Sequence, residues 1–408
     1  MKCRHCATPI TQRFIDLGFA PPSNAYLTAQ DLHLPELYFP LNVNVCEQCW
    51  LVQTEDYAQA DQLFDADYAY FSSTSQSWIA HAAHYAEIII EQLSLDENSH
   101  VIEIASNDGY LLKNFVIANI PCLGIEPTVS TASAAEALGI PVQRDFFSES
   151  LSKVLVEKEL QADLIIGNNV YAHVPDINDF TRGLKTALKA QGTITLEFPH
   201  LLKLIEQVQF DTIYHEHFSY LSLYTVKRIF ESAGLRIWNV EVLETHGGSL
   251  RIYGCHATDS RPSLDTVKYM LDKENKNGLQ NVSLYLQFQA RADKVKNDLL
   301  SFLLEQKKAG KTVVAYGAAA KGNTLLNYAG VKPDLLSLVC DAAPSKQGRY
   351  MPGSHIPILH PDVLSLDAPD YLLILPWNIV AELKQQNIAL TEQGTMFVTA
   401  VPSIIIHD

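Results

Sequence analysis

The chain has 408 residues, of which 47% are hydrophobic and 19% are charged, and its formal net charge at pH 7 is −16. This length exceeds one ordinary hydrophobic core and predicts two or three domains, while the composition excludes a disordered chain. The acidic balance, without a run of Lys and Arg, excludes the usual nucleic-acid-binding proteins and disfavours anionic membranes as partners.

The N-terminus turns polar at once, and no apolar run approaches the ~20 residues that span a bilayer. We therefore expect a cytoplasmic protein with reduced thiols and with neither nucleic acid nor membrane as a partner. No feature of the sequence fixes an oligomeric state.

Residues 1–66 are predicted to form a small module of loops and strands. It contains two cysteine pairs, Cys3-x-x-Cys6 and Cys46-x-x-Cys49. Each pair can point two thiolates at one ion, and four thiolates complete a tetrahedral zinc site that has no open position. Although the pairs are further apart than in a usual zinc ribbon, we expect a structural zinc that helps a small module to fold.

Strand and helix patterns alternate through the middle of the chain. This alternation predicts a mainly parallel sheet with helices on both faces, which is a Rossmann-like α/β domain. The predicted strands are 101–105, 122–126, 163–168 and 192–198, and the predicted helices are 77–93, 110–118, 129–138 and 178–190.

Ligands of such sheets bind at the carboxyl ends of the strands. The first strand ends in a turn of small residues, 105–109, that lets the backbone approach a ligand closely. This turn lacks the GxGxxG pattern, which disfavours a dinucleotide with a pyrophosphate; S-adenosylmethionine has no phosphate and fits better. Glu126, after the second strand, can accept hydrogen bonds from a ribose diol. Asp145 can accept from an adenine amine, with Phe146 or Phe147 packed on the ring.

The predicted cofactor-binding residues lie in or after these strands. They are Glu103, Ala105, Ser106, Asn107, Asp108, Gly109, Glu126, Pro127, Asp145, Phe146, Phe147, Asn168 and Asn169.

The segment 211–220 contains two histidines, two carboxylates and two tyrosines. Histidine is the side chain whose ordinary pKa lies nearest neutrality, so it can remove a proton at physiological pH. A neighbouring carboxylate can orient the ring. We therefore expect acid–base chemistry at this segment.

The C-terminal part begins with a charged helical connector, 256–308, with a break at 275–278. A second α/β domain of residues 309–408 follows, with strands at 312–316, 335–340, 371–375 and 396–400. The turn 317–321 precedes a helix and carries a lysine, which is a natural anion site. Residues 245–251 form either a backbone-donor loop, where Arg251 clamps a phosphate, or a tight hairpin turn.

Taken in order, the motifs of the chain resemble those of the sugar C-methyltransferases that act on nucleotide-linked 4-keto-6-deoxyhexoses in branched-sugar biosynthesis. The resemblance covers essentially the whole chain. Besides the paired cysteines, the motifs are DYAYFSSTSQSW at 67–78, VIEIASNDGYLL at 101–112, NNVYAHV at 168–174, TIYHEHFSYLS at 212–222, HGGSLR at 246–251 and GAAAKGNTLLN at 317–327.

The resemblance implies an α/β fold with a zinc module (1–66), an S-adenosylmethionine-dependent methyltransferase domain (67–255), a helical connector (256–308) and a C-terminal Rossmann-like domain that holds the sugar nucleotide (309–408). It makes His217 the general base. The residues implied to line the reacting sugar are Tyr214, Glu216, His173 and one of Tyr68 and Tyr70. The predicted substrate-binding residues are Ser249, Arg251, Lys321, Asn323, Lys346 and Arg349.

The expected reaction begins when His217 removes a proton from carbon 3, next to a ketone at carbon 4, while Tyr214 or His173 donates to the enolate oxygen. The carbanion then takes the methyl group. Carbon 5 is the alternative position, and thymidine diphosphate is the family's usual carrier. Two other functions fit the residues less well: an O- or N-methyltransferase, and a non-catalytic zinc-ribbon scaffold.

Overall fold

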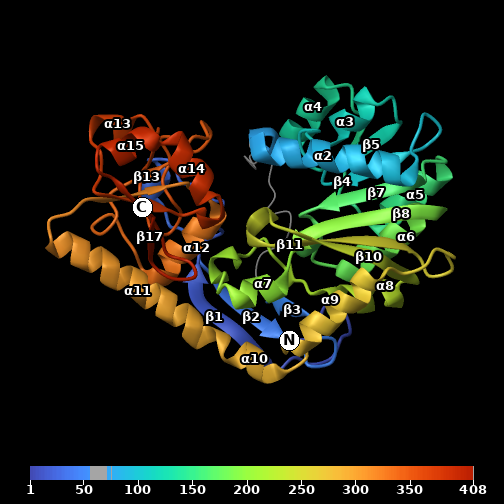
Figure 1. The fold of residues 1–408 in the computed structure, drawn as a ribbon, viewed down its shortest axis with the longest axis horizontal. Coiled ribbons are helices and arrows are strands. Elements are labelled where there is room, and N and C mark those ends of the chain that lie inside the picture. The colour runs from blue at the N-terminus through green and yellow to red at the C-terminus, as the bar shows by residue number, and fades with distance from the viewer. Residues whose placement is uncertain (56–70, 75, 408) are drawn as a thin grey trace.

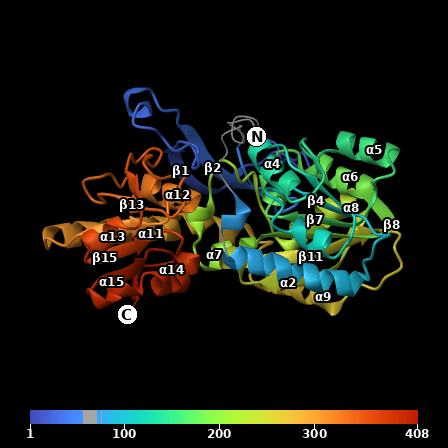
Figure 2. The ribbon, with the colours of Figure 1, turned by 90° about the horizontal axis from the view of Figure 1, so that it is seen from above.

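The structure is a computed structural model that describes residues 1–55, 71–74 and 76–407 (Figure 1). Three β-sheets organise this part of the chain. The central sheet and the C-terminal sheet lie at opposite ends of the molecule, and the N-terminal strands lie between them (Figures 1 and 2). No helix in the described ranges is both long and apolar enough to cross a membrane.

The central sheet has seven strands in the order β10-β11-β8-β7-β4-β5-β6. Only β11 runs antiparallel to its neighbours, so the prediction of a mainly parallel Rossmann-like sheet is confirmed. The strands are β4 (Val101–Ile104), β5 (Cys122–Ile125), β6 (Val142–Gln143), β7 (Ala162–Asn168), β8 (Leu188–Pro199), β10 (Leu235–Leu243) and β11 (Ser249–His256).

Helices cover both faces of this sheet because successive residues of its central strands point to opposite sides. On β7, Ile165 packs in one apolar cluster, whereas Leu164 and Ile166 pack in another. The first face is covered by α5 (Glu149–Glu157), α6 (Ile177–Ala187), α8 (Leu223–Ser232) and α9 (Asp265–Lys276), and the second by α2 (Gln76–Leu93), α3 (Leu112–Ile117) and α4 (Val129–Ala137).

All four strands predicted for this domain are present. The structure adds β6, α5 and the β10–β11 hairpin, which the sequence pattern did not assign. Residues 245–247 form the turn of that hairpin, with Leu243 paired to Ser249, so the hairpin alternative holds for this motif.

The N-terminal sheet has four antiparallel strands in the order β1-β2-β3-β9. Its last strand does not come from the N-terminus: β9 (Ser219–Tyr220) begins two residues after His217. The others are β1 (Gln12–Ala20), β2 (Phe39–Val45) and β3 (Val52–Thr54). The segment with the histidines is therefore fixed to the cysteine-bearing module.

The C-terminal sheet has the order β14-β13-β12-β15-β16-β17, and only β17 is antiparallel. The break predicted at 275–278 separates α9 from α10. The strands are β12 (Val313–Tyr316), β13 (Val339–Cys340), β14 (Ile358–Leu359), β15 (Tyr371–Ile374), β16 (Met396–Thr399) and β17 (Ile405–His407), and the helices of this region are α10 (Val282–Leu286), α11 (Phe288–Lys308), α12 (Ala320–Ala329), α13 (Val363–Leu366), α14 (Val380–Gln386) and α15 (Ile388–Glu392).

One apolar cluster runs from the N-terminal sheet through α7 (Leu201–Glu206) and α11 into the C-terminal sheet. Phe14 of β1 stacks on Phe288 of α11, with ring centroids 4.5 Å apart. Because this core is shared, the cysteine module and the C-terminal sheet hold each other in place.

A buried carboxylate joins the connector to the central domain. Glu274 of α9 is fully buried and accepts hydrogen bonds from the backbone N–H groups of Leu223 (2.6 Å) and Tyr224 (2.9 Å), at the start of α8. His200, just after β8, lies with its Nε2 2.7 Å from Glu274 Oε1. The negative charge also suits the positive end of the α8 dipole.

Replacing Glu274 with alanine should lower the free energy of unfolding by about 3–5 kcal/mol, because two N–H groups and an imidazole would be left buried without their acceptor. Urea denaturation followed by circular dichroism measures this loss. The control is Glu305→Ala on the exposed side of α11, which should change stability by less than about 0.5 kcal/mol. A loss below about 1 kcal/mol for Glu274→Ala would contradict the prediction.

Candidate active site and metal centre

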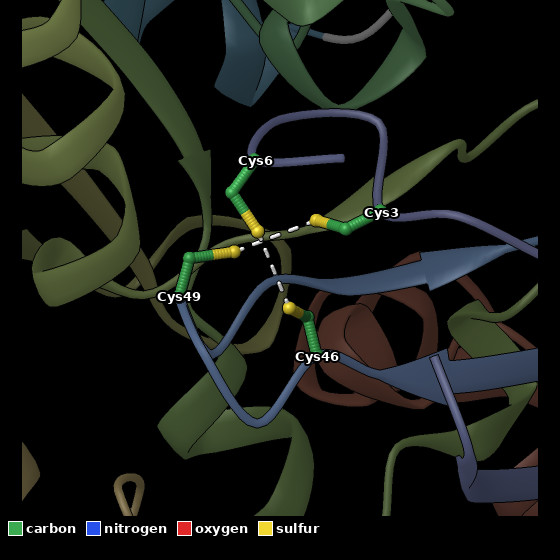
Figure 3. A group of neighbouring side chains, drawn as sticks. All are labelled: Cys3, Cys6, Cys46 and Cys49. Carbon is green, nitrogen blue, oxygen red and sulfur yellow. Dashed lines mark hydrogen bonds between the residues drawn. The ribbon is translucent and has the colours of Figure 1, made fainter. Parts of the chain in front are cut away.

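The four predicted metal ligands converge on one point (Figure 3). The Sγ atoms of Cys3, Cys6, Cys46 and Cys49 all lie within 4.8 Å of one another. The pairs Cys3–Cys49 and Cys6–Cys46 are each 3.5 Å apart. Four sulfurs at ~2.3 Å from a tetrahedral zinc lie roughly 3.8 Å from each other, so the cluster fits zinc.

The two cysteine turns share one backbone form. In each, the residue after the second cysteine has a positive φ, 59° for Ala7 and 62° for Trp50. Its N–H bonds back to the carbonyl of the first cysteine, at 2.9 Å to Cys3 and 2.7 Å to Cys46. This common turn points both thiols of a pair inward, which the spacing had predicted.

The predicted cofactor turn after β4 is tightly wound. Ala105, Asn107 and Gly109 all have positive φ, between 51° and 77°. A Cβ at Gly109 would lie 2.4 Å from Ile140 Cδ1, and one at Gly124 of β5 would lie 2.4 Å from Ser106 Oγ. Only glycine fits these two positions, and the backbone can therefore lie close to the strand ends.

Glu126 is held at the end of β5 by its neighbours. Its Oε2 accepts from the N–H of Asn107 (3.0 Å) and its Oε1 from the N–H of Thr128 (2.9 Å). Each carboxylate oxygen keeps a second lone pair for a hydroxyl. Burial, followed by the charges of Glu126 and Asp108, raises the pKa of Glu103 well above its ordinary value.

Several polar atoms at this edge are buried without a hydrogen-bond partner among the described residues. They are Ser106 Oγ, Asp108 Oδ1 and both amide atoms of Asn168. Burying a polar group in this state costs free energy unless a ligand or water satisfies it. The edge therefore fits a polar ligand.

The remaining cofactor candidates divide by exposure. Phe147 packs against Phe180, with ring centroids 5.1 Å apart, whereas Phe146 is 50% exposed next to the exposed Asp145. Phe146 is thus the ring available to a ligand. The half-buried Pro127 follows Glu126.

The segment before α2 covers the cofactor turn. The N–H of Ser72 donates to Asn107 Oδ1 (2.9 Å) and that of Ser73 to Asp108 Oδ2 (3.1 Å). Tyr68 and Tyr70, one of which is predicted to line the sugar, lie outside the described residues.

His217 is almost fully buried, and its tautomer is fixed. Nδ1 lies 2.8 Å from the carbonyl oxygen of Thr212 and donates to it, which leaves the lone pair on Nε2. Burial, followed by the influence of His173, lowers the pKa of His217 well below its ordinary value. The ring is therefore neutral at pH 7 and can accept a proton.

The structure brings three of the predicted catalytic residues together. The ring centroid of His217 lies 3.9 Å from that of Tyr214 and 4.6 Å from that of His173. His173 ends the short 3₁₀ helix Tyr171–His173 after β7, and burial lowers its pKa to about 4. A backbone hydrogen bond from Phe218 N to Ala172 O (2.9 Å) holds the two segments side by side.

Glu216 points to the N-terminal module. Its Oε2 accepts from Asn24 Nδ2 at 2.6 Å, and burial raises its pKa to about 7. From the same loop, Tyr26 donates to the carbonyl of Ala318, at 2.5 Å, in the turn before α12. The N-terminal loop thus lies between the histidine segment and the C-terminal sheet.

Lys321 reaches the same site from the C-terminal sheet. Its Nζ donates to Asn378 Oδ1 (2.7 Å) and lies 4.7 Å from the ring centroid of Trp377. Trp377 Nε1 donates to Asp211 Oδ2 (2.7 Å). The Lys321 charge also contributes to lowering the pKa of His217, after burial, His173 and His246.

The other substrate candidates differ in their surroundings. Lys346 Nζ donates to Ala318 O (2.8 Å), next to Lys321's turn. Arg251 is buried and donates to Glu197 (2.8 Å), so its charge is already balanced.

Three further candidates are engaged elsewhere or exposed. Asn323 donates to Ser23 O (2.6 Å) at the boundary with the N-terminal loop, and Ser249 Oγ donates to Thr245 O (3.0 Å) within the hairpin. Arg349 is exposed, and its charge acts on Asp31 of the N-terminal module.

Sequence reasoning missed five residues of this region. His246 accepts from Asn169 Nδ2 (2.9 Å) through Nε2, and its ring packs edge-on against Trp78 at 4.9 Å. His246 and Trp78 both lie in motifs quoted above, HGGSLR and DYAYFSSTSQSW, so the sequence did contain a signal for these two residues. Asn24, Asp211 and Trp377 come from three separate elements, and only the tertiary structure brings the last two into contact.

Removing one cysteine of the cluster should release the zinc. We expect about one zinc per chain by atomic emission in the purified protein, and far less in Cys49→Ser, because three thiolates leave the ion open to water and chelators. The control is Cys122→Ser, since Cys122 lies outside the cluster. Equal zinc content in Cys49→Ser and the unchanged protein would refute the assignment.

The chain matches known families along most of its length. Residues 3–64 match the family described as "Putative zinc binding domain", residues 78–240 match "Methyltransferase domain", and residues 244–402 match "C-methyltransferase C-terminal domain". Together with the cysteine cluster, these matches confirm S-adenosylmethionine and zinc as the cofactors.

Two solved structures resemble part of the chain. Magnesium protoporphyrin IX methyltransferase from Synechocystis PCC 6803 with bound SAM is 12% identical, with a TM-score of 0.33 over 44% of this chain and 81% of that one. PH0226 protein from Pyrococcus horikoshii OT3 is 10% identical, with a TM-score of 0.36 over 49% of this chain and 99% of that one.

A curated protein matches nearly the full length. C-methyltransferase NovU from Streptomyces niveus is 31% identical over 401 residues, which are 98% of this chain and 95% of that protein. The chain belongs to the family of S-adenosylmethionine-dependent C-methyltransferases.

Proposed function

We propose that the protein transfers a methyl group from S-adenosylmethionine to carbon 3 of a nucleotide-linked 4-keto-6-deoxyhexose, carried on thymidine diphosphate, in branched deoxysugar biosynthesis. One observation carries the proposal: a neutral His217, with its lone pair on Nε2, lies beside His173 and Tyr214 in a buried site.

A base is needed because the acceptor is a carbon atom, which must lose a proton before it can attack. A ketone at carbon 4 acidifies the neighbouring C–H bond. His217 takes the proton at Nε2, while its Nδ1–H bond to Thr212 O keeps the ring oriented. Tyr214 or His173 donates to the developing enolate oxygen. Bound S-adenosylmethionine supplies an electrophilic methyl group.

The cofactor would be held at the edge formed by β4, β5 and β7. Glu126 is oriented to accept from the ribose hydroxyls, and Phe146 is exposed for the adenine ring. Polar atoms of Asn168 and Asp108 are buried at this edge without a hydrogen-bond partner among the described residues, so a bound ligand could supply one. These contacts position the donor, which is the main contribution that a protein makes to a transfer of this kind.

The nucleotide would bind at the edge of the C-terminal sheet. The turn 317–319 precedes the ten-residue helix α12, whose N-terminus favours an anion. Lys321, in the first turn of α12, and Lys346 lie at this turn. Asp341 orders the turn by accepting from Ala318 N (2.7 Å), and it also pairs with Lys346 (3.5 Å). A diphosphate here would place the attached sugar toward His217.

His217→Asn should lower kcat by roughly 10²–10⁴-fold, the usual contribution of a general base, and leave the Kd for S-adenosylmethionine within about twofold. The assay incubates the thymidine-diphosphate ketosugar with the methyl donor in heavy water and follows both methyl gain and deuterium uptake by mass spectrometry. Both should decline together.

Two results would contradict the proposal. A variant with nearly the original rate would exclude His217 as the base. If the unchanged enzyme instead adds the methyl group to oxygen or nitrogen, without deuterium entering a ring carbon of the substrate, that result would favour an O- or N-methyltransferase.

The rate should persist at acid pH. His217 works in its neutral form, and its lowered pKa keeps that form dominant at pH 6.5, where an ordinary histidine is half protonated. Glu216, whose pKa is raised to about 7, also titrates in this range, so the test uses Glu216→Gln. In that variant kcat/KM should stay within about twofold from pH 8 to pH 6.5. A decline centred on pH 6.5–7 would show an ordinary base.

A further inference from the structure

Arg4 lies between two zinc ligands, yet its side chain leaves the cysteine turn. Nη1 donates to the carbonyl of Pro175 (2.8 Å) and Nη2 donates to the carbonyl of Thr54 (3.1 Å). Its backbone N–H donates to Gln53 Oε1 (2.9 Å). One guanidinium therefore joins two segments that are more than a hundred residues apart in sequence.

Both acceptors belong to segments that hold the histidines. Pro175 follows His173 by two residues. Thr54 is the end of β3, and its Oγ1 donates to the carbonyl of His217 (3.3 Å). The Arg4 guanidinium carbon also lies 5.4 Å from the ring centroid of Phe218, the next residue.

The turn that carries Arg4 is itself anchored. Asn178 Nδ2 donates to the carbonyls of Arg4 (3.2 Å) and His5 (2.9 Å), which fixes the turn on the start of α6. Gln53 Nε2 donates to Cys3 Sγ (3.3 Å). The backbone of Arg4 is held by the metal turn on one side and by α6 on the other. A shift of the turn would therefore move the Arg4 side chain and, through it, the segments of Pro175 and Thr54.

We propose that Arg4 is a positioning residue that couples the zinc-binding turn to the two segments carrying His173 and His217, and thereby sets the separation of the two imidazoles. This inference rests on the proposed role of His217. Arginine suits the task because its planar fork donates in two fixed directions, whereas lysine offers one compact charge. The zinc site would thus serve catalysis as well as folding.

The geometry that is fixed in this way is tight. The two imidazole centroids are 4.6 Å apart, and a shift of about 1 Å in a reacting group can cost roughly 10²-fold in rate. Losing Arg4 would leave the backbone bond between Phe218 and Ala172 as a remaining link between the segments.

The test compares Arg4→Ala and Arg4→Lys in the zinc-loaded, full-length protein. For Arg4→Ala we expect unchanged zinc content, a Kd for S-adenosylmethionine within about twofold, and a kcat lower by roughly 10–100-fold. In Arg4→Ala, the imidazole NMR signals of both His173 and His217, assigned with single histidine variants, should shift. The rate and the shifts of Arg4→Lys should lie between those of Arg4→Ala and those of the unchanged protein. The matched control is Arg13→Ala, which removes only an exposed ion pair with Asp16 (2.7 Å) and should change none of these values.

Unshifted imidazole signals, with kcat within about threefold of the original, would overturn the proposal. If Arg4→Ala loses zinc, the decision passes to Arg4→Lys, which keeps the stem and charge: zinc-loaded Arg4→Lys with original signals and rate would also overturn it. The NMR shifts report the coupling whether or not His217 is the base, so failure of the proposed function is recognised separately, from the rate of His217→Asn.

Discussion

The site depends on the pairing of β3 with β9. In this short antiparallel contact, Val52 lies opposite Tyr220 and Gln53 opposite Ser219. One strand belongs to the cysteine module and the other follows directly after His217. A two-residue strand is too short to be stable alone. Its position is therefore defined by the metal-bound turns and by the apolar core that the module shares with the C-terminal sheet.

Burial makes the charges in the site differ from what the net charge of the chain suggests. The chain carries a formal charge of −16, which should repel an anionic substrate. In the candidate site, burial raises the pKa of Glu103 well above its ordinary value, that of Glu216 to about 7 and that of Asp211 to about 6. The same burial keeps His217 neutral, as a base requires. Lys321 then adds positive charge to the region.

The cofactor edge has a tightly defined backbone. Positive φ at Ala105, Asn107 and Gly109 winds the turn, and backbone N–H groups orient Glu126. Strained backbone of this kind persists only where the surroundings enforce it. Here the tight packing of Gly109 on Ile140 and of Gly124 on Ser106 supplies that enforcement, and polar atoms of Asp108 and Asn168 are buried nearby without a partner among the described residues.

The sequence by itself determined the local features. Hydrophobic runs located the central strands, because a buried parallel strand must be apolar on both faces. The spacing within each Cys-x-x-Cys pair determined the metal ligands, because such a turn converges two thiols on its own. Motif order then led to the family and to His217. Each strand run, cysteine pair and motif is contained within about twelve consecutive residues, whereas the order of the motifs extends over the chain.

Only the tertiary structure decided which distant groups meet. The N-terminal sheet takes its fourth strand from residue 219 onward, Glu216 turns to Asn24, and Trp377 bonds to Asp211. It also decided that Arg251 is paired with Glu197 and that Phe147 packs against Phe180. These outcomes depend on how three sheets share their cores, and packing between segments that are distant in the sequence leaves no periodic trace in the sequence of either one.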